Sequence, residues 1–161
     1  REVDLTLLDR QAVVSGDTLN AYAELGWRVT VQCIDVRDWA ARTPATRYDL
    51  CLANLFLHHF ERAPLAGLLR GIAAAADAFI ACEPRRSGLA RLGSRLIGLL
   101  GVNAVTRDDA VKSVAAGFDG RELTCAWEAA GIAGWHTDEH FAPPFTHCFS
   151  AVRGDDRPSS S

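Results

Sequence analysis

The sequence predicts an α/β fold with a mixed sheet that is mostly parallel and ends in an antiparallel hairpin. Short apolar runs alternate with stretches of helical periodicity, which is the pattern of strands joined by crossover helices. A polar residue closes each of the first four runs: Asp9, Asp35, Asn54 and Glu83. Because the carboxyl ends of parallel strands meet at one edge of a sheet, these residues predict a site there for a nucleotide-like ligand.

The first half of the chain is expected to alternate strands and helices. The expected strands lie at 3–8, 27–34, 48–53 and 78–83. A helix after residue 16 takes Asp17 as its N-cap and stops at Gly26. Residues 35–39 form the turn after the second strand. A second helix covers 64–76, with Pro64 in its first turn, where proline is well tolerated.

The regular alternation breaks at residues 85–118. The expected elements from there on are amphipathic helices at 89–100 and 108–116, a helix at 121–130, and strands at 135–141 and 145–152. The last two strands are predicted to pair antiparallel around Pro143-Pro144. The polar, Pro/Ser-rich tail at 154–161 is expected to be disordered.

Composition places the chain among ordinary soluble globular domains. Its 161 residues suit one domain, and 48% are hydrophobic and 23% charged. The net charge of -3 and the lack of a Lys/Arg stripe give no reason to expect nucleic acid as a partner. No apolar run reaches the ~20 residues that span a bilayer, and nothing resembles a signal peptide, so the cytoplasm is the expected location.

Five cysteines are spread along the chain, at positions 33, 51, 82, 125 and 148. No two of them have C-x-x-C spacing, which argues against a zinc site. All but Cys125 fall in expected strands, where a free cysteine usually behaves as a small buried hydrophobe. We therefore expect no metal site and a packing role for these four.

Three segments together resemble the class I S-adenosylmethionine-dependent methyltransferases. They are Leu-Leu-Asp-Arg at 7–10, Cys-Ile-Asp-Val at 33–36, and the run at 48–60 that contains Leu-His-His. The resemblance is to the small-molecule branch that carries a Leu-His-His after the fourth strand, and residues 145–149 suit the last strand of that group. It implies a Rossmann-like, methyltransferase-like domain over residues 1–153, with S-adenosylmethionine as cofactor.

The resemblance assigns the adenosine part of this cofactor to two strand ends. Asp9, with Arg10 beside it, matches the carboxylate that grips both ribose hydroxyls, and a carboxylate can accept two hydrogen bonds from a vicinal diol. Asp35 matches the acidic residue that accepts from the adenine amino group, and Asp38 is an alternative for this role. The backbone N–H of Val36 would then meet a ring nitrogen.

The resemblance also indicates where the methyl group is handled. Asn54 and Leu55 match the segment beside the methionine part of the cofactor. The candidate bases are His58, His59 and His147, because an imidazole can accept a proton at physiological pH. Two further histidines, His136 and His140, are interpreted as surface residues of the late hairpin.

In the family, chain inserted after the fifth strand often covers the acceptor. Residues 85–118 therefore become the expected substrate cap, and their apolar helix face suggests a hydrophobic acceptor such as a phenol, a quinone or a polyketide-like molecule. The same helix could instead pack on the sheet or form a dimer contact, so a homodimer is also considered.

One departure from the family pattern is large. The family's first strand and G-x-G-x-G loop lie about 20 residues before the position of Asp9, whereas only eight residues precede it here. The domain is therefore expected to be incomplete at its N-terminus. Two other functions stay open: a non-catalytic methyltransferase-like binding or interaction domain, and a nucleotide-binding oxidoreductase, in which an acidic strand end would also hold ribose.

Overall fold

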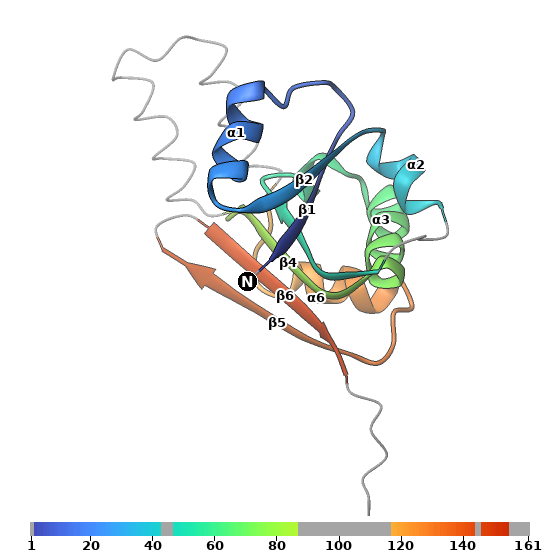
Figure 1. The fold of residues 1–161 in the computed structure, drawn as a ribbon. Coiled ribbons are helices and arrows are strands. Elements are labelled where there is room, and N and C mark those ends of the chain that lie inside the picture. The colour runs from blue at the N-terminus through green and yellow to red at the C-terminus, as the bar shows by residue number, and fades with distance from the viewer. Residues whose placement is uncertain (1, 43–46, 87–116, 144–145, 155–161) are drawn as a thin grey trace, which may run out of the picture. The chain divides into compact units, whose positions relative to one another are not determined.

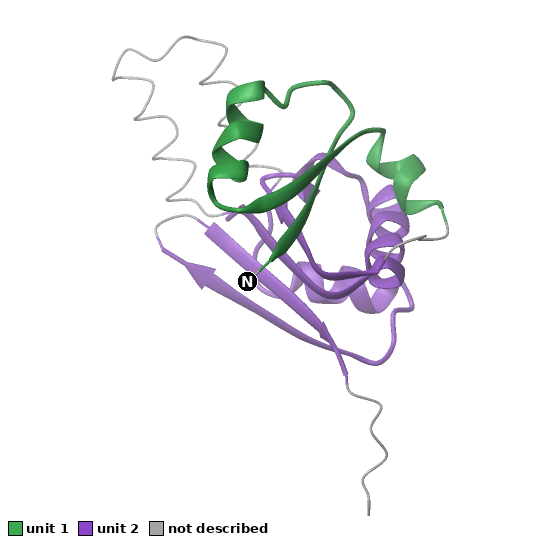
Figure 2. Cartoon of the chain, in the orientation of Figure 1, with its two compact units in different colours: residues 1–42 green, residues 43–161 purple. Residues whose placement is uncertain are grey.

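The computed structural model describes residues 2–42, 47–86, 117–143 and 146–154. The chain divides into two compact units, residues 1–42 and 43–161 (Figure 2). Each unit is an α/β structure built around its own sheet, and each is treated separately below.

The first unit is a parallel β-α-β motif followed by a short helix (Figure 1). Strand β1 (Val3–Asp9) pairs in parallel with β2 (Trp27–Cys33), from Val3 opposite Trp27 to Asp9 opposite Cys33. Helix α1 (Gly16–Glu24) makes the crossover, and α2 (Val36–Ala40) follows β2 directly. The register puts the carboxyl ends of both strands side by side.

The second unit has a four-stranded mixed sheet in the order β3-β4-β6-β5. Its strands are β3 (Tyr48–Asn54), β4 (Ala76–Pro84), β5 (Trp135–Ala142) and β6 (Thr146–Arg153). Strands β3 and β4 are parallel, while β6 runs antiparallel to both β4 and β5. The 3₁₀ turn η1 (Leu57–His59) and helix α3 (Arg62–Ala75) connect β3 to β4, and α6 (Glu122–Ala129) precedes β5.

The core of the second unit lies between this sheet and its two helices. Alternate residues of β4 and β6 are fully buried: Phe79, Ala81, Phe149 and Ala151. Trp127 of α6 packs on them, with its ring centroid 6.0 Å from that of Phe79 and 5.6 Å from that of Phe149. Helix α3 contributes a stripe of leucine and isoleucine spaced by three and four residues, which is the apolar face of an amphipathic helix.

The fold class expected from the sequence is confirmed. Strands, parallel pairs and the late antiparallel hairpin form as predicted, although the structure describes the strands as two sheets. The cap of α1 was predicted wrongly: Ser15, not Asp17, is the N-cap, and its side chain accepts from Thr18 N at 3.2 Å. A serine hydroxyl at this position satisfies one of the free N–H groups of the first turn.

Two other local predictions need correction. Residues 35–39 were expected to form a turn, but they begin helix α2, because Asp35 caps its first turn. Cys33 was expected to be buried, but it is exposed on the two-stranded sheet. The expected helices at 89–100 and 108–116 and almost all of the tail lie outside the described residues. Among the helices that the structure describes, none has the length and apolarity to cross a membrane.

Candidate functional site

In the first unit, two acidic residues lie at adjacent strand ends. The N–H of Ile34 donates to the carbonyl of Asp9 at 3.0 Å, so the chain leaving β2 is hydrogen-bonded to the end of β1. This brings Asp9 and Asp35 to the same end of the parallel pair. The Asp9 carboxylate is exposed, and its Oδ1 accepts from the Gln11 N–H at 2.7 Å.

Asp35 is held more tightly than Asp9. Its Oδ1 accepts from the backbone N–H of Arg37 at 2.9 Å, and the Arg37 guanidinium donates to both carboxylate oxygens, through Nε at 3.0 Å and Nη2 at 2.8 Å. These bonds hold the pKa of Asp35 well below its usual range, and the side-chain bonds contribute more than the backbone bond. The positive charge of Arg10 lowers the pKa further. The carboxylate is therefore ionised at neutral pH.

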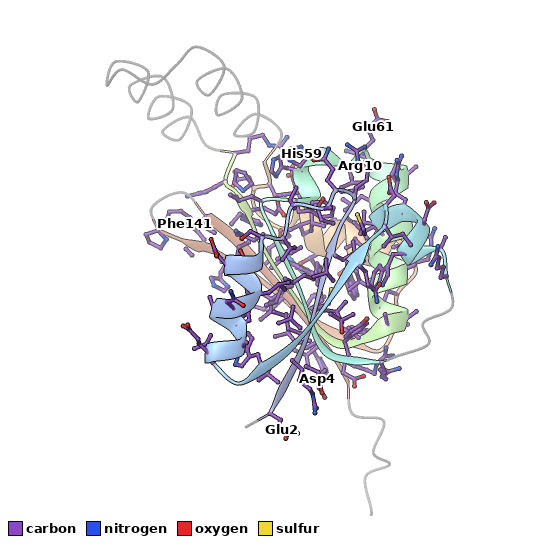
Figure 3. All side chains as sticks on the ribbon, turned by 45° about the horizontal axis from the view of Figure 1, so that its top comes forward. Glu2, Asp4, Arg10, His59, Glu61 and Phe141 are labelled. Atoms are coloured by element: carbon purple, nitrogen blue, oxygen red, sulfur yellow. The ribbon has the colours of Figure 1, made fainter. Side chains whose placement is uncertain are left out.

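The other two predicted residues of this unit lie at the same strand ends. Arg10 is exposed directly after β1, and Figure 3 shows it at the opposite end of the strand from Glu2 and Asp4. Val36 opens α2, where the first N–H groups of a helix lack intrahelical acceptors. The unit thus gathers two carboxylates, the guanidinium groups of Arg10 and Arg37, and helix N–H groups around a single edge.

In the second unit, the chain turns sharply after β3. Asn54 is exposed as the last residue of the strand, and Leu55 adopts a left-handed backbone conformation with φ of 52°. The N–H of Leu55 donates to the carbonyl of Cys82 on β4 at 2.8 Å. The side chain of Leu55 remains 56% exposed, so these two predicted residues present an open surface at the strand end.

A buried carboxylate organises this turn. Oε1 of Glu83, at the end of β4, accepts from the N–H groups of Phe56 at 3.0 Å and Leu57 at 2.8 Å. Oε2 accepts from the His58 N–H at 3.4 Å and lies 2.7 Å from Nδ1 of the same residue. The side chain of Glu83 is fully buried, and that of His58 is only 4% exposed. The predicted base His58 is thus part of a buried carboxylate–imidazole pair.

The three predicted bases lie in different environments. His59, the last residue of η1, is exposed (Figure 3). Its ring centroid lies 4.0 Å from that of His58. His147 is 2% exposed, and its Nε2 lies 2.5 Å from Oε1 of Glu139. Of the three, His59 alone presents its ring to solvent. The surface interpretation of His136 and His140 is confirmed, since both are exposed on β5.

Sequence reasoning missed the second buried carboxylate, Glu139 of β5. It accepts from the N–H groups of Leu123 at 3.0 Å and Thr124 at 2.9 Å, at the start of α6. The period of two along β5 could have revealed it, because Glu139 alternates onto the same face as Trp135 and Thr137. The sequence placed Glu83 at a strand end, but no sequence pattern predicts its hydrogen bonds to the turn after β3.

Comparison with known proteins shows the fold but no close relative. No family model matches the chain, and no curated protein matches it significantly. Solved structures do match, although at low sequence identity. One is a candidate O-methyltransferase from Nostoc punctiforme, with a TM-score of 0.59 and 18% identity over 94% of this chain and 44% of the other.

Two further structures give the same result. The pyocyanin biosynthetic protein PhzM matches with a TM-score of 0.60 and 16% identity, over 95% of this chain and 50% of its own. Magnesium protoporphyrin IX methyltransferase from Synechocystis, solved with bound S-adenosylhomocysteine, has a TM-score of 0.56 and 13% identity over 95% of this chain and 74% of its own. The chain spans half or less of the first and second of these proteins, and it has the fold of methyltransferase structures.

Proposed function

We propose that this chain binds S-adenosylmethionine and takes part in transferring its methyl group to a hydrophobic small molecule, such as a phenol, a quinone or a polyketide-like acceptor. The observation that carries the proposal is the pair of carboxylates, Asp9 and Asp35, at hydrogen-bonded ends of adjacent parallel strands. The methyltransferase fold of the chain supports it.

The residues of the first unit suit an adenosine. A carboxylate has about four acceptor positions, and the structure records only the Gln11 N–H on Asp9 among the described residues. The remaining positions would accept from both ribose hydroxyls, with Arg10 alongside. The first-turn N–H of Val36 would donate to an adenine ring nitrogen, and the ionised Asp35 would accept from the amino group in competition with Arg37.

The residues of the second unit suit the other end of the cofactor. Asn54 offers an exposed amide, with both donor and acceptor atoms, and Leu55 beside it is exposed in the left-handed turn at the strand end. We assign these two residues to the methionine part. The amide nitrogen of Asn54 would donate to the carboxylate of the methionine part, and the amide oxygen would accept from its amino group.

The bound sulfonium would supply a good leaving group, so the protein's task is to position the acceptor and, where needed, to deprotonate it. We assign the base to His59, because its ring is exposed, whereas His58 and His147 are buried against carboxylates. The segment at 85–118 stays our candidate for an apolar cap over the acceptor.

The ribose assignment is tested with Asp9→Asn in the complete protein. The amide keeps the shape but loses the charge that strengthens both hydrogen bonds, so the affinity for S-adenosylhomocysteine should fall ~10-fold or more in calorimetric titration. The matched control is Asp4→Asn, the same change at the other end of β1, where Asp4 pairs with Arg28. The assignment fails if Asp9→Asn binds as tightly as Asp4→Asn.

A further inference from the structure

The turn after β3 is hydrogen-bonded to the last residues of β4. All four successive N–H groups of residues 55–58 donate to β4, the first to the carbonyl of Cys82 and the other three to the carboxylate of Glu83. Successive N–H groups that converge in this way form a concave site for an anion. Here the anion is a side chain of the same protein.

The turn is strained, which makes this anchor necessary. A left-handed conformation at a residue other than glycine costs ~1–2 kcal/mol, and such a residue persists only where its surroundings fix it. Leu55 has φ of 52°, yet its side chain is 56% exposed, so burial cannot supply the constraint. The conformation is held instead by the hydrogen bonds to Cys82 and Glu83 and by the buried side chain of Leu57 two residues on.

The anchor also depends on the turn. Glu83 is fully buried, and a buried carboxylate is costly unless its oxygens are hydrogen-bonded. Two backbone N–H groups satisfy Oε1, while the N–H and Nδ1 of His58 satisfy Oε2. If the turn changed its conformation, Glu83 would lose most of its partners. The strained turn and the buried charge therefore hold each other in one arrangement.

We propose that Glu83 is the positioning residue for the cofactor-binding turn. Glu83 accepts hydrogen bonds from residues 56–58 and so fixes the backbone conformation of the preceding Asn54 and Leu55. Under the function proposed above, Asn54 and Leu55 contact the methionine part of S-adenosylmethionine. Glu83 is buried and does not itself touch the cofactor. His58 belongs to the same anchor, which gives it a role other than that of a base. This inference rests on the proposed function.

The chain contains a matched control for this role. Glu139 is also buried, pairs with a buried histidine, and accepts from two successive backbone N–H groups. Those N–H groups, however, belong to the start of α6 and not to the turn after β3. Replacing Glu139 should therefore lower stability much as replacing Glu83 does, without disturbing Asn54 and Leu55.

The experiment compares Glu83→Gln and Glu139→Gln in the complete protein. Calorimetric titration measures the Kd for S-adenosylhomocysteine, and thermal unfolding measures the loss of stability. We expect Glu83→Gln to raise the Kd ~10-fold or more, because small displacements of a binding group are costly, while Glu139→Gln leaves it near the wild-type value. Amide hydrogen exchange at residues 55–58 should accelerate in Glu83→Gln only.

Three outcomes decide the matter. A wild-type protein that binds no S-adenosylhomocysteine overturns the proposed function, and this inference with it. Normal wild-type binding with an unchanged Kd in Glu83→Gln overturns this inference alone, as does an equal loss in both variants. If Glu83→Gln does not fold, the experiment uses Glu83→Asp in its place. The shorter side chain keeps the charge but cannot reach all three N–H groups. Unchanged binding of S-adenosylhomocysteine in Glu83→Asp likewise overturns the inference.

Discussion

Asp35 has a structural role in the first unit that does not depend on the adenine contact proposed for it. It caps α2 and pairs with Arg37, so it has a structural function even without a ligand. The pKa of Asp35 is lower in the folded unit than its ordinary value of 3.8. The charged carboxylate therefore stabilises the folded unit above pH 3.8, and this stabilisation disappears as the pH falls through the lower pKa of the folded state. Because Arg37 is largely exposed and Asp35 is only partly buried, salt screens this contribution.

The substitution Arg37→Ala tests the cause of this shift. It removes the guanidinium but keeps the N–H of residue 37, so the pKa of Asp35 should rise toward 3.8 and remain somewhat below it. A carbon-13 NMR titration of the carboxyl carbon measures the midpoint. Arg28→Ala, which breaks the other exposed pair on this unit, serves as control and should leave Asp35 unchanged. A midpoint that does not move in Arg37→Ala contradicts this explanation.

The assignment of His59 as the base makes a second prediction at the residue scale. His59→Ala should lower turnover ~100-fold or more with an acceptor that must lose a proton, measured as S-adenosylhomocysteine formed at saturating acceptor. His140→Ala removes another exposed histidine, one that pairs with Asp138, and should leave turnover intact. Full activity in His59→Ala would remove that residue from the mechanism.

At the scale of elements, residues 117–119 lie against the end of β4, and a glycine at position 117 makes this close approach possible. Gly117 lies so close to Pro84 that a Cβ would overlap the Pro84 carbonyl oxygen. That oxygen accepts from Phe118 N–H at 3.0 Å, and the Phe118 carbonyl accepts from Arg86 N–H at 2.9 Å. An ion pair between Arg85 Nε and Asp119 Oδ1, at 3.3 Å, links the same two stretches of chain. These contacts join residues 84–86 to residues 117–119.

Gly117→Ala should therefore lower the free energy of unfolding by about 1–3 kcal/mol, as in other overpacked sites. Gly67→Ala provides the contrast, because nothing lies within 4 Å of a Cβ at Gly67 in α3. There, alanine should raise stability by about 0.5–1 kcal/mol through its better helix propensity. Urea denaturation of both variants checks the pair, and a Gly117→Ala protein as stable as wild type would show that the segment can shift.

The sequence predicted elements better than it predicted contacts. Period-two and helical patterns located the described strands and the helices α1, α3 and α6 to within a few residues, because they reflect which face is buried, but the short helix α2 was taken for a turn. The cap of α1 was missed since Ser15 and Asp17 are both good N-caps and only the backbone geometry distinguishes them. The carboxylate–histidine pairs were missed because Glu83 and Glu139 pair with histidines 25 and 8 residues away in the sequence. No pattern in the neighbouring residues predicts such a pairing.

At the scale of the whole molecule, the fold is shared with the three solved structures described above at only 13–18% identity. Such a likeness can persist because a fold depends on the pattern of apolar and turn residues, which many sequences satisfy. Function depends instead on particular groups. In this chain, the groups that we propose for it are the carboxylates of Asp9 and Asp35, the turn at Asn54 and Leu55, and the imidazole of His59.

The most direct test of the central claim is a calorimetric titration of the complete protein with S-adenosylmethionine, S-adenosylhomocysteine and, separately, NADPH. We expect one molecule of either sulfur compound to bind per chain and NADPH to give no binding heat. Binding of NADPH with no response to the sulfur compounds would contradict the account and favour a nucleotide-dependent oxidoreductase.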